Sequence, residues 1–182
     1  MTNFKSNKSI EEKIHEVILK QCDFLSDVIR ENLYYSLDYY DFKGVKLSPI
    51  EKLFIVGFEG FKMHQNLDNH TVIGNYELEY NKKIVINDKT YYIDFVLLDK
   101  KGNDFKVAIE LDGYIWHGTD AEQFDRDKKR ERALQSAGYK VVRFSGKEIY
   151  KNIQEVMNEL EIIYFHRYNE LERMVKNNGK TT

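Results

Sequence analysis

Three carboxylates interrupt two apolar runs of the sequence that otherwise have the composition of β-strands. Asp94 lies within YYIDFVLL, whereas Glu110 and Asp112 lie within VAIELDG. Side chains of a strand alternate between its two faces, so Glu110 and Asp112 share one face. The intervening KKGND, residues 100–104, has the length and the glycine of a hairpin loop. If this hairpin places Asp94 across from Glu110, all three carboxylates converge.

Converging carboxylates repel one another, which limits what such a cluster can do. Two unit charges about 4 Å apart repel by roughly 4 kcal/mol at an effective dielectric constant of about 20. The cluster is therefore expected to take up a proton or to bind a cation. Oxygen ligands suit a hard divalent ion, so the residues predict a site for Mg²⁺ or Mn²⁺. His117 follows the second run and could accept a proton there, although a loop histidine is often incidental.

The metal site depends on strand register. A slip of one residue moves every side chain of a strand to the other face. Pairing of Asp94 with Ile109 instead of Glu110 would therefore remove the site, unless a bulge corrected it.

A local excess of basic residues follows the acidic cluster. The formal net charge of −2 neither argues for a polyanionic partner nor excludes one. Residues 126–147, however, contain eight basic and two acidic side chains. This segment is the candidate phosphate-binding region, and a solvated helix face is the alternative. Arg130 could instead pair with Asp127, and Arg143 is expected to satisfy a buried carboxylate rather than to contact phosphate. The candidate nucleic-acid contacts are Arg126, Lys129, Arg130 and Arg143.

Helix and strand signals alternate along the chain. Ser9 with Glu12, and Ser48 with Glu51, have the spacing of capping boxes at helix starts. Glu51 therefore has a sufficient structural role. The pattern further predicts an antiparallel meander of strands over residues 71–112 with turns at 81–82 and 87–88, a helix over 121–137 ended by Gly138, a strand over 139–144, and a helical stretch from Ser145 to about residue 174.

The chain length suits one domain with an extension. The single cysteine, Cys22, excludes an internal disulfide framework and a multi-cysteine zinc site, which favours a reducing, cytoplasmic compartment. No apolar run resembles a signal peptide or a membrane span, so we expect neither secretion nor membrane insertion.

The order of these motifs resembles the PD-(D/E)xK nuclease superfamily. Within it, the chain is most similar to the very short patch repair endonucleases, their uncharacterised bacterial relatives and the EDxHD homing endonucleases. The resemblance covers about residues 48–160. The matching segments are SPIE (48–51), IDF (93–95), IELDG (109–113), His117, DKKRERAL (127–134) and GYKVVRF (138–144).

This resemblance implies an α/β (α+β) fold with a restriction-endonuclease-like core, in which helices flank a mixed sheet with an antiparallel meander. Together with the helix signals and the polar tail, it predicts an N-terminal helical extension over residues 1–45, a nuclease-like domain over 46–176 and a disordered tail over 177–182. The implied roles are metal ligation by Asp94 and Glu110, an acid at or next to the metal for Glu51, a base or leaving-group acid for His117, and orientation of His117 by Asp127.

One position departs from the superfamily. Asp112 stands where a lysine is common, so water activation would fall to His117 and the metal. We therefore predict a cytoplasmic, Mg²⁺-dependent endonuclease that hydrolyses DNA phosphodiester bonds, with nicking and double-strand cleavage both open. The alternatives are a catalytically weak DNA-binding module of nuclease fold and a phosphodiesterase acting on RNA. The N-terminal helix could place DNA or form a homodimer.

Overall fold

The computed structural model describes residues 9, 12–14, 16, 46–67, 76–99, 106–113 and 121–178. Its elements alternate helices and strands in the order that the sequence predicts. They are helix α3 (Pro49–Leu67), strands β1 (Tyr76–Ile86), β2 (Lys89–Asp99) and β3 (Lys106–Asp112), helix α4 (Ala121–Ser136), strand β4 (Lys140–Ser145), and helices α5 (Gly146–Lys151) and α6 (Ile153–Asn178).

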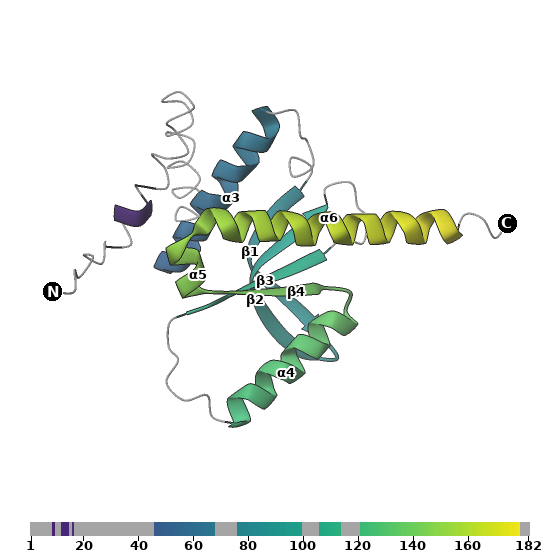
Figure 1. Ribbon diagram of the computed structural model, residues 1–182. Helices are drawn as coiled ribbons and strands as arrows, with labels where there is room; N and C mark the ends of the chain where they lie inside the picture. Colours follow the sequence, from purple (N-terminus) through teal and green to yellow (C-terminus); the bar gives the residue numbers. More distant parts are fainter. Residues whose placement is uncertain are drawn as a thin grey trace.

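The four strands form one mixed sheet in the order β1-β2-β3-β4. The first three make an antiparallel meander, and β4 lies parallel to β3. A parallel neighbour requires a crossover connection, which contains α4. Helices α3, α5 and α6 lie on one side of the sheet and α4 lies on the other (Figure 1). The predicted fold class, a mixed sheet with an antiparallel meander flanked by helices, is confirmed.

Each face of the sheet has its own apolar core. The larger core lies between the sheet and α3, α5 and α6, and it includes Phe54, Phe95, Ile109 and Tyr164. The smaller core lies under α4 and consists of Ile93, Val96, Ala108 and Leu134, with partly buried neighbours.

The β1–β2 hairpin rotates about its long axis part-way along its length, so that its two halves pack against different cores. Tyr80 packs against the larger core, whereas Ile84, further along the same strand, packs against the smaller one. The register is the same before and after this point, with Tyr80 opposite Phe95 and Lys82 opposite Ile93. Asn81, in between, has a left-handed φ of 45°. Both strands therefore rotate together at Asn81 and at Asp94, which lies opposite it.

Two local predictions were wrong. The pair Asn81-Lys82 does not form a turn, because β1 continues through it; the left-handed conformation of Asn81 is accommodated inside the strand. The helical stretch after Ser145 is not continuous, because Asn152 (φ −155°, ψ 81°) separates α5 from α6. The predicted turn at Asn87 and Asp88 is confirmed, with φ values of 48° and 61°.

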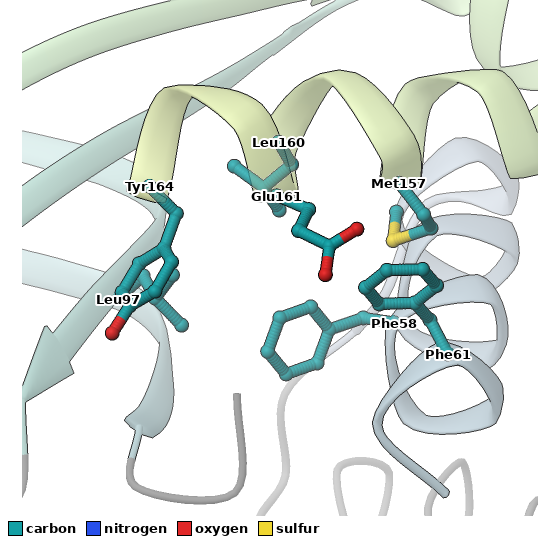
Figure 2. A pocket seen from close by; sticks show the side chains of 7 residues that line it. All are labelled: Phe58, Phe61, Leu97, Met157, Leu160, Glu161 and Tyr164. Atoms are coloured by element: carbon teal, nitrogen blue, oxygen red, sulfur yellow. The ribbon is translucent and has the colours of Figure 1, made fainter. Parts of the chain in front are cut away.

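Helices α3 and α6 pack closely because α3 has a glycine where they meet. A Cβ atom at Gly57 would lie 2.3 Å from Cγ1 of Ile153. Further along this seam lies a small hollow of about 10 Å³, whose lining side chains Figure 2 shows. This volume holds at most one water molecule. The hollow is lined by Phe58, Phe61, Leu97, Met157, Leu160, Glu161 and Tyr164.

The described part of the N-terminal region packs onto the larger core. Ser9 and Glu12 form the predicted capping box, with backbone-to-side-chain distances of 2.7 and 3.1 Å. Ile14 is 8% exposed and belongs to the larger core. The rest of the predicted helix, the homodimer contact assigned to it and residues 179–182 lie outside the described residues. The division into 1–45, 46–176 and 177–182 stays a prediction. In the described part of the chain, no helix combines the length and apolar character needed to span a bilayer.

Candidate active site

The predicted register between β2 and β3 is present. Phe95 pairs with Ile109, so the next residue along, Asp94, lies across from Glu110. The regular pairing of the two strands ends at Phe95 and Ile109. Beyond it, the backbone N–H of Leu111 donates a hydrogen bond to Oδ2 of Asp94 at 2.7 Å. The side chain of Asp94 thus takes the place of the backbone hydrogen bond that would continue the pairing of the strands, at the point where β2 turns away from β3.

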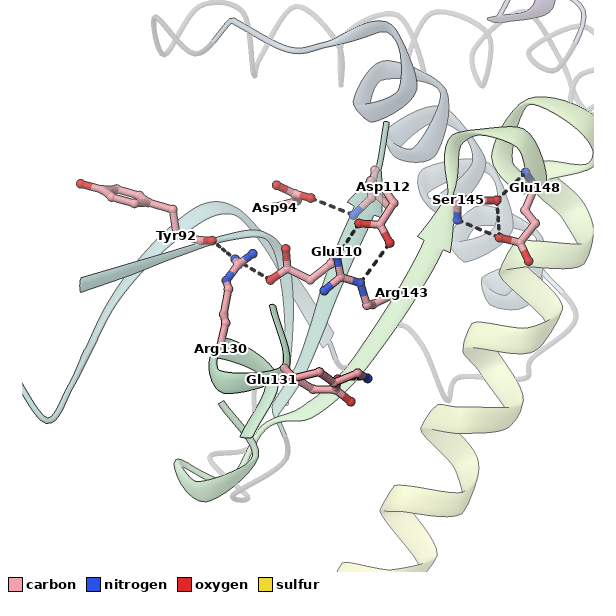
Figure 3. A network of polar contacts seen from close by, with 11 residues as sticks. Tyr92, Asp94, Glu110, Asp112, Arg130, Glu131, Arg143, Ser145 and Glu148 are labelled. Atoms are coloured by element: carbon pink, nitrogen blue, oxygen red, sulfur yellow. Dashed lines mark hydrogen bonds and ion pairs between the residues drawn. The ribbon is translucent and has the colours of Figure 1, made fainter. Parts of the chain in front are cut away.

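Glu110 is the most enclosed carboxylate of the site. Its side chain is 5% exposed, and Oε1 accepts a hydrogen bond from Nη2 of Arg130 at 2.7 Å. The same nitrogen of Arg130 also donates to the backbone carbonyl of Tyr92 (Figure 3). Burial raises the pKa of Glu110 to about 7; the charge of Arg130 opposes this rise and that of Asp94 adds to it.

Asp94 has a similar environment. Burial raises the pKa of its carboxyl, and the nearby carboxylates of Glu51 and Asp112 raise it further. The hydrogen bond from Leu111 and the charge of Arg130 act in the opposite direction. Two neighbouring carboxyls with raised pKa values are typical of functional sites, because a stable core would avoid them.

Asp112 faces a different partner. Arg143 of β4 donates from Nε at 3.0 Å and from Nη2 at 2.5 Å to the two oxygens of Asp112. This two-point pairing follows from the parallel register, which places Glu110 beside Arg143 and Asp112 beside Ser145. The side chain of Asp112 is 40% exposed, so Arg143 satisfies an accessible carboxylate rather than a buried one.

The expected convergence of three carboxylates on one ion is not present. Within the described ranges, no three His, Cys, Asp or Glu side chains are arranged to hold a metal ion. The physical reason is that both oxygens of Asp112 are engaged by Arg143. Asp94 and Glu110 still suit Mg²⁺, which commonly takes one or two carboxylates and completes its coordination with waters and substrate phosphates. The carboxylates of Asp94 and Glu110 therefore fit a Mg²⁺ site that has two protein ligands.

Glu51 approaches the site from the first turn of α3. Its carboxylate accepts from the backbone N–H of Ser48 at 2.5 Å, and its own N–H donates to Oγ of Ser48 at 3.3 Å, as the capping box predicts. Tyr80 also hydrogen-bonds to this carboxylate. Burial, then the charge of Glu51 and this hydrogen bond, raise the pKa of Tyr80 to about 12. Glu51 is close enough to Asp94 to raise its pKa.

Tyr80 was missed by the sequence reasoning. The sequence contains the information needed to place Tyr80. The turn at Asn87 and Asp88 fixes the β1–β2 register, which puts Tyr80 opposite Phe95, the residue after Asp94. Recognising it required reading β1 as one continuous strand.

The remaining predicted site residues that the structure describes lie on α4. His117 lies outside the described residues, so its role stays a prediction. Asp127 is near enough to Arg143 to raise the pKa of that guanidinium, after the contributions of Asp112 and Glu110. Arg126 is exposed and pairs with Glu122 at 3.5 Å. Lys129 is exposed.

A known protein family matches the region that carries the site. Residues 75–162 match the family model REase_MTES_1575, a restriction-endonuclease-like family. An uncharacterised protein from Haemophilus influenzae is 38% identical over 87 residues, which are 48% of this chain and 46% of the relative. The match thus spans less than half of that relative. No solved structure matches. The family match supports a nuclease of restriction-endonuclease type. It covers β1 to β4 and therefore includes Asp94, Glu110 and Arg130, but not Glu51.

Proposed function

We propose that the chain is a metal-dependent endonuclease that hydrolyses DNA phosphodiester bonds. The observation that carries the proposal is the pair of Asp94 and Glu110, brought together where β2 turns away from β3. Burial raises the pKa values of both carboxyls, and the neighbouring carboxylates raise them further. The similarity to a restriction-endonuclease-like family supports the reaction class.

In this proposal Asp94 and Glu110 hold Mg²⁺ or Mn²⁺. When bound, such an ion neutralises charge on the phosphate and lowers the pKa of its water. Without the ion, Arg130 pairs with the Glu110 carboxylate. The side chains of Glu51 and Tyr80 lie beside Asp94 and add polar groups to the site. Asp112 orients Arg143 instead of binding the ion.

The proton-transfer and DNA-binding roles are further parts of the proposal. His117 would accept the proton from the attacking water, with Asp127 as its orienting partner. Lys129 and Arg126 on the exposed face of α4 would contact phosphates. A homodimer through the N-terminal helix stays a prediction.

Cleavage of supercoiled plasmid DNA in Mg²⁺ or Mn²⁺ tests the proposal. We expect wild-type protein to nick or linearise the plasmid, and Asp94→Asn and Glu110→Gln each to reduce the rate by at least about a hundredfold. Asp125→Asn is a matched control, because Asp125 is an exposed acid on α4, and it should retain activity. Full activity in both site variants would refute the proposal.

A second candidate is a DNA-binding module with little catalysis. It is favoured by the pairing of Asp112 with Arg143, which leaves two carboxylates rather than three for an ion. This module would bind DNA in chelator, with an affinity that falls steeply with salt, and would cleave neither DNA nor RNA in either metal. Cleavage of RNA but not DNA in the same assay would instead identify an RNA phosphodiesterase that uses the same acids.

A further inference from the structure

Arg130 connects α4 to both strands that carry the site. Its Nη2 atom donates to Oε1 of Glu110 at 2.7 Å and also to the carbonyl oxygen of Tyr92. Figure 3 shows the guanidinium reaching from α4 into the space between these two groups. The side chain of Glu110 is 5% exposed, whereas that of Arg130 is 27% exposed. One partner of this ion pair is therefore enclosed, and the other has a route to solvent.

The positive charge of Arg130 acts on both predicted metal ligands. It lowers the pKa of Glu110 and that of Asp94, against the upward shift that burial causes. The other guanidinium of the site, on Arg143, is held by both oxygens of Asp112. Arg130 thus supplies the positive charge at the place where the proposed function puts a divalent cation.

We propose that Arg130 is an exchangeable counter-ion of Glu110, which it neutralises in the DNA-free protein and releases for a DNA phosphate when a divalent cation binds. This inference rests on the proposed function, because it assumes the metal site at Asp94 and Glu110. A guanidinium within hydrogen-bonding distance of Glu110 would lie beside a doubly charged ion on the same carboxylate, and like charges at that separation repel strongly. The planar guanidinium also suits two-point binding to phosphate.

The proposal requires cooperative binding of metal and DNA. A phosphate that attracts Arg130 removes the competitor from Glu110, so DNA should tighten metal binding. By thermodynamic linkage, the metal must then tighten DNA binding by the same factor. A purely structural role, in which Arg130 only holds α4 on the sheet, would produce no such coupling.

Isothermal titration calorimetry with Mn²⁺ at about pH 8, above the pKa of Glu110, tests the inference. Without DNA, Arg130→Gln should bind Mn²⁺ about tenfold more tightly than wild type, the usual order of such couplings. With a phosphorothioate duplex that resists cleavage, the wild-type affinity for Mn²⁺ should rise by a similar factor and the variant's should change little. Arg130→Lys, which keeps the charge, should behave more like wild type.

Two controls locate the effect. Arg132→Gln removes an equal charge from an exposed position on the same helix and should leave the Mn²⁺ affinity of the DNA-free protein unchanged. Glu110→Gln combined with Arg130→Gln removes the shared carboxylate, so the gain in Mn²⁺ affinity should disappear. Thermal unfolding of each variant checks that it is folded.

The outcomes separate the inference from the proposed function. Unchanged or weaker Mn²⁺ binding by Arg130→Gln, or the absence of DNA coupling in wild type, overturns the inference while the metal site stands. Absence of Mn²⁺ binding by the wild-type protein, with and without DNA, overturns the proposed function and the inference together.

Discussion

At the residue scale, the site has more carboxylates than cations to balance them. Arg143 is held by both oxygens of Asp112. Arg130 hydrogen-bonds to Glu110 and its charge also acts on Asp94, while burial weakens the hydration of both acids. Burial is the main cause of the raised pKa values of both acids, and the neighbouring carboxylates add to it. A group with a shifted pKa makes folding depend on pH.

Glu110 should make the metal-free protein less stable as the pH rises. Its pKa is about 7 in the folded protein and 4.5 ordinarily, so between these values the folded state keeps a proton that the unfolded state has lost. The contribution to stability is complete below about pH 4.5 and is lost by about pH 7, at roughly 1.4 kcal/mol per unit of pKa separation. Urea unfolding in chelator from about pH 5 to 8 measures this fall. Glu110→Gln should show a smaller fall, and equal falls in the two proteins would contradict the assignment.

Asp94 should stabilise the fold through its hydrogen bond as well as serve the site. Asp94→Asn keeps an acceptor for the N–H of Leu111, whereas Asp94→Ala leaves this donor without it. We expect the alanine variant to be less stable than the asparagine variant by about 1 kcal/mol or more, measured by urea unfolding. Equal stabilities would mean that water replaces the side chain at no cost.

The residues of the site differ in how far the sequence predicts them. The pairing of Asp94 with Glu110 follows from strand alternation and the length of the loop between them, both of which are local. The contact between Arg130 and Glu110 depends on how α4 lies on the sheet, which no local pattern encodes. Sequence reasoning also missed that Arg143 engages both oxygens of Asp112, because this needs the register of a parallel pair formed across a crossover.

At the element scale, the site depends on the rotation of the β1–β2 hairpin at Asn81 and Asp94. Regular alternation would keep Tyr80 and Ile84 on one face, but they pack against opposite cores. Sequence patterns assume regular strands, so the asparagine at the rotation point was mistaken for a turn. The division between α5 and α6 was missed for a similar reason, since the apolar spacing continues across Asn152.

The packing of α3 on α6 should depend on the absence of a side chain at Gly57. Alanine normally favours a helix over glycine by about 1 kcal/mol, but here its Cβ would lie 2.3 Å from Cγ1 of Ile153. We expect Gly57→Ala to lower the free energy of unfolding by about 1–3 kcal/mol.

A double-mutant cycle identifies the cause. Ile153→Ala removes the clashing atom, so Gly57→Ala in that background should be neutral or stabilising. Destabilisation of the same size in both backgrounds, measured by urea unfolding, would show that Ile153 is not responsible.

At the scale of the whole molecule, the described N-terminal residues belong to the same folded unit as the site. Ile14 is buried in the larger core, and the Lys13 ammonium lies 6.0 Å from the centre of the Tyr150 ring. The larger core also supports β2 and β3 through Phe95 and Ile109. Stability of the first helix and of the sheet should therefore be coupled.

Ile14→Ala should destabilise the entire protein. Truncation of a buried isoleucine costs about 2–5 kcal/mol, and the lower part of this range suits a site near the edge of a core. The variant should unfold in a single transition at a lower urea concentration than wild type. A separate early transition, with the main one unchanged, would show that the N-terminal region folds independently.

The left-handed residue in β1 has a second consequence. Among the described strands, β1 is an outer strand of the sheet and is 11 residues long. A long, straight outer strand can recruit strands of neighbouring molecules. The left-handed Asn81 changes the orientation of β1 near its middle, and Lys82 and Lys83 follow directly. The available edge is divided into two short, differently oriented stretches with charges at the division. We therefore expect the same rotation that places Asp94 in the site to disfavour edge-to-edge pairing of β1 with neighbouring molecules.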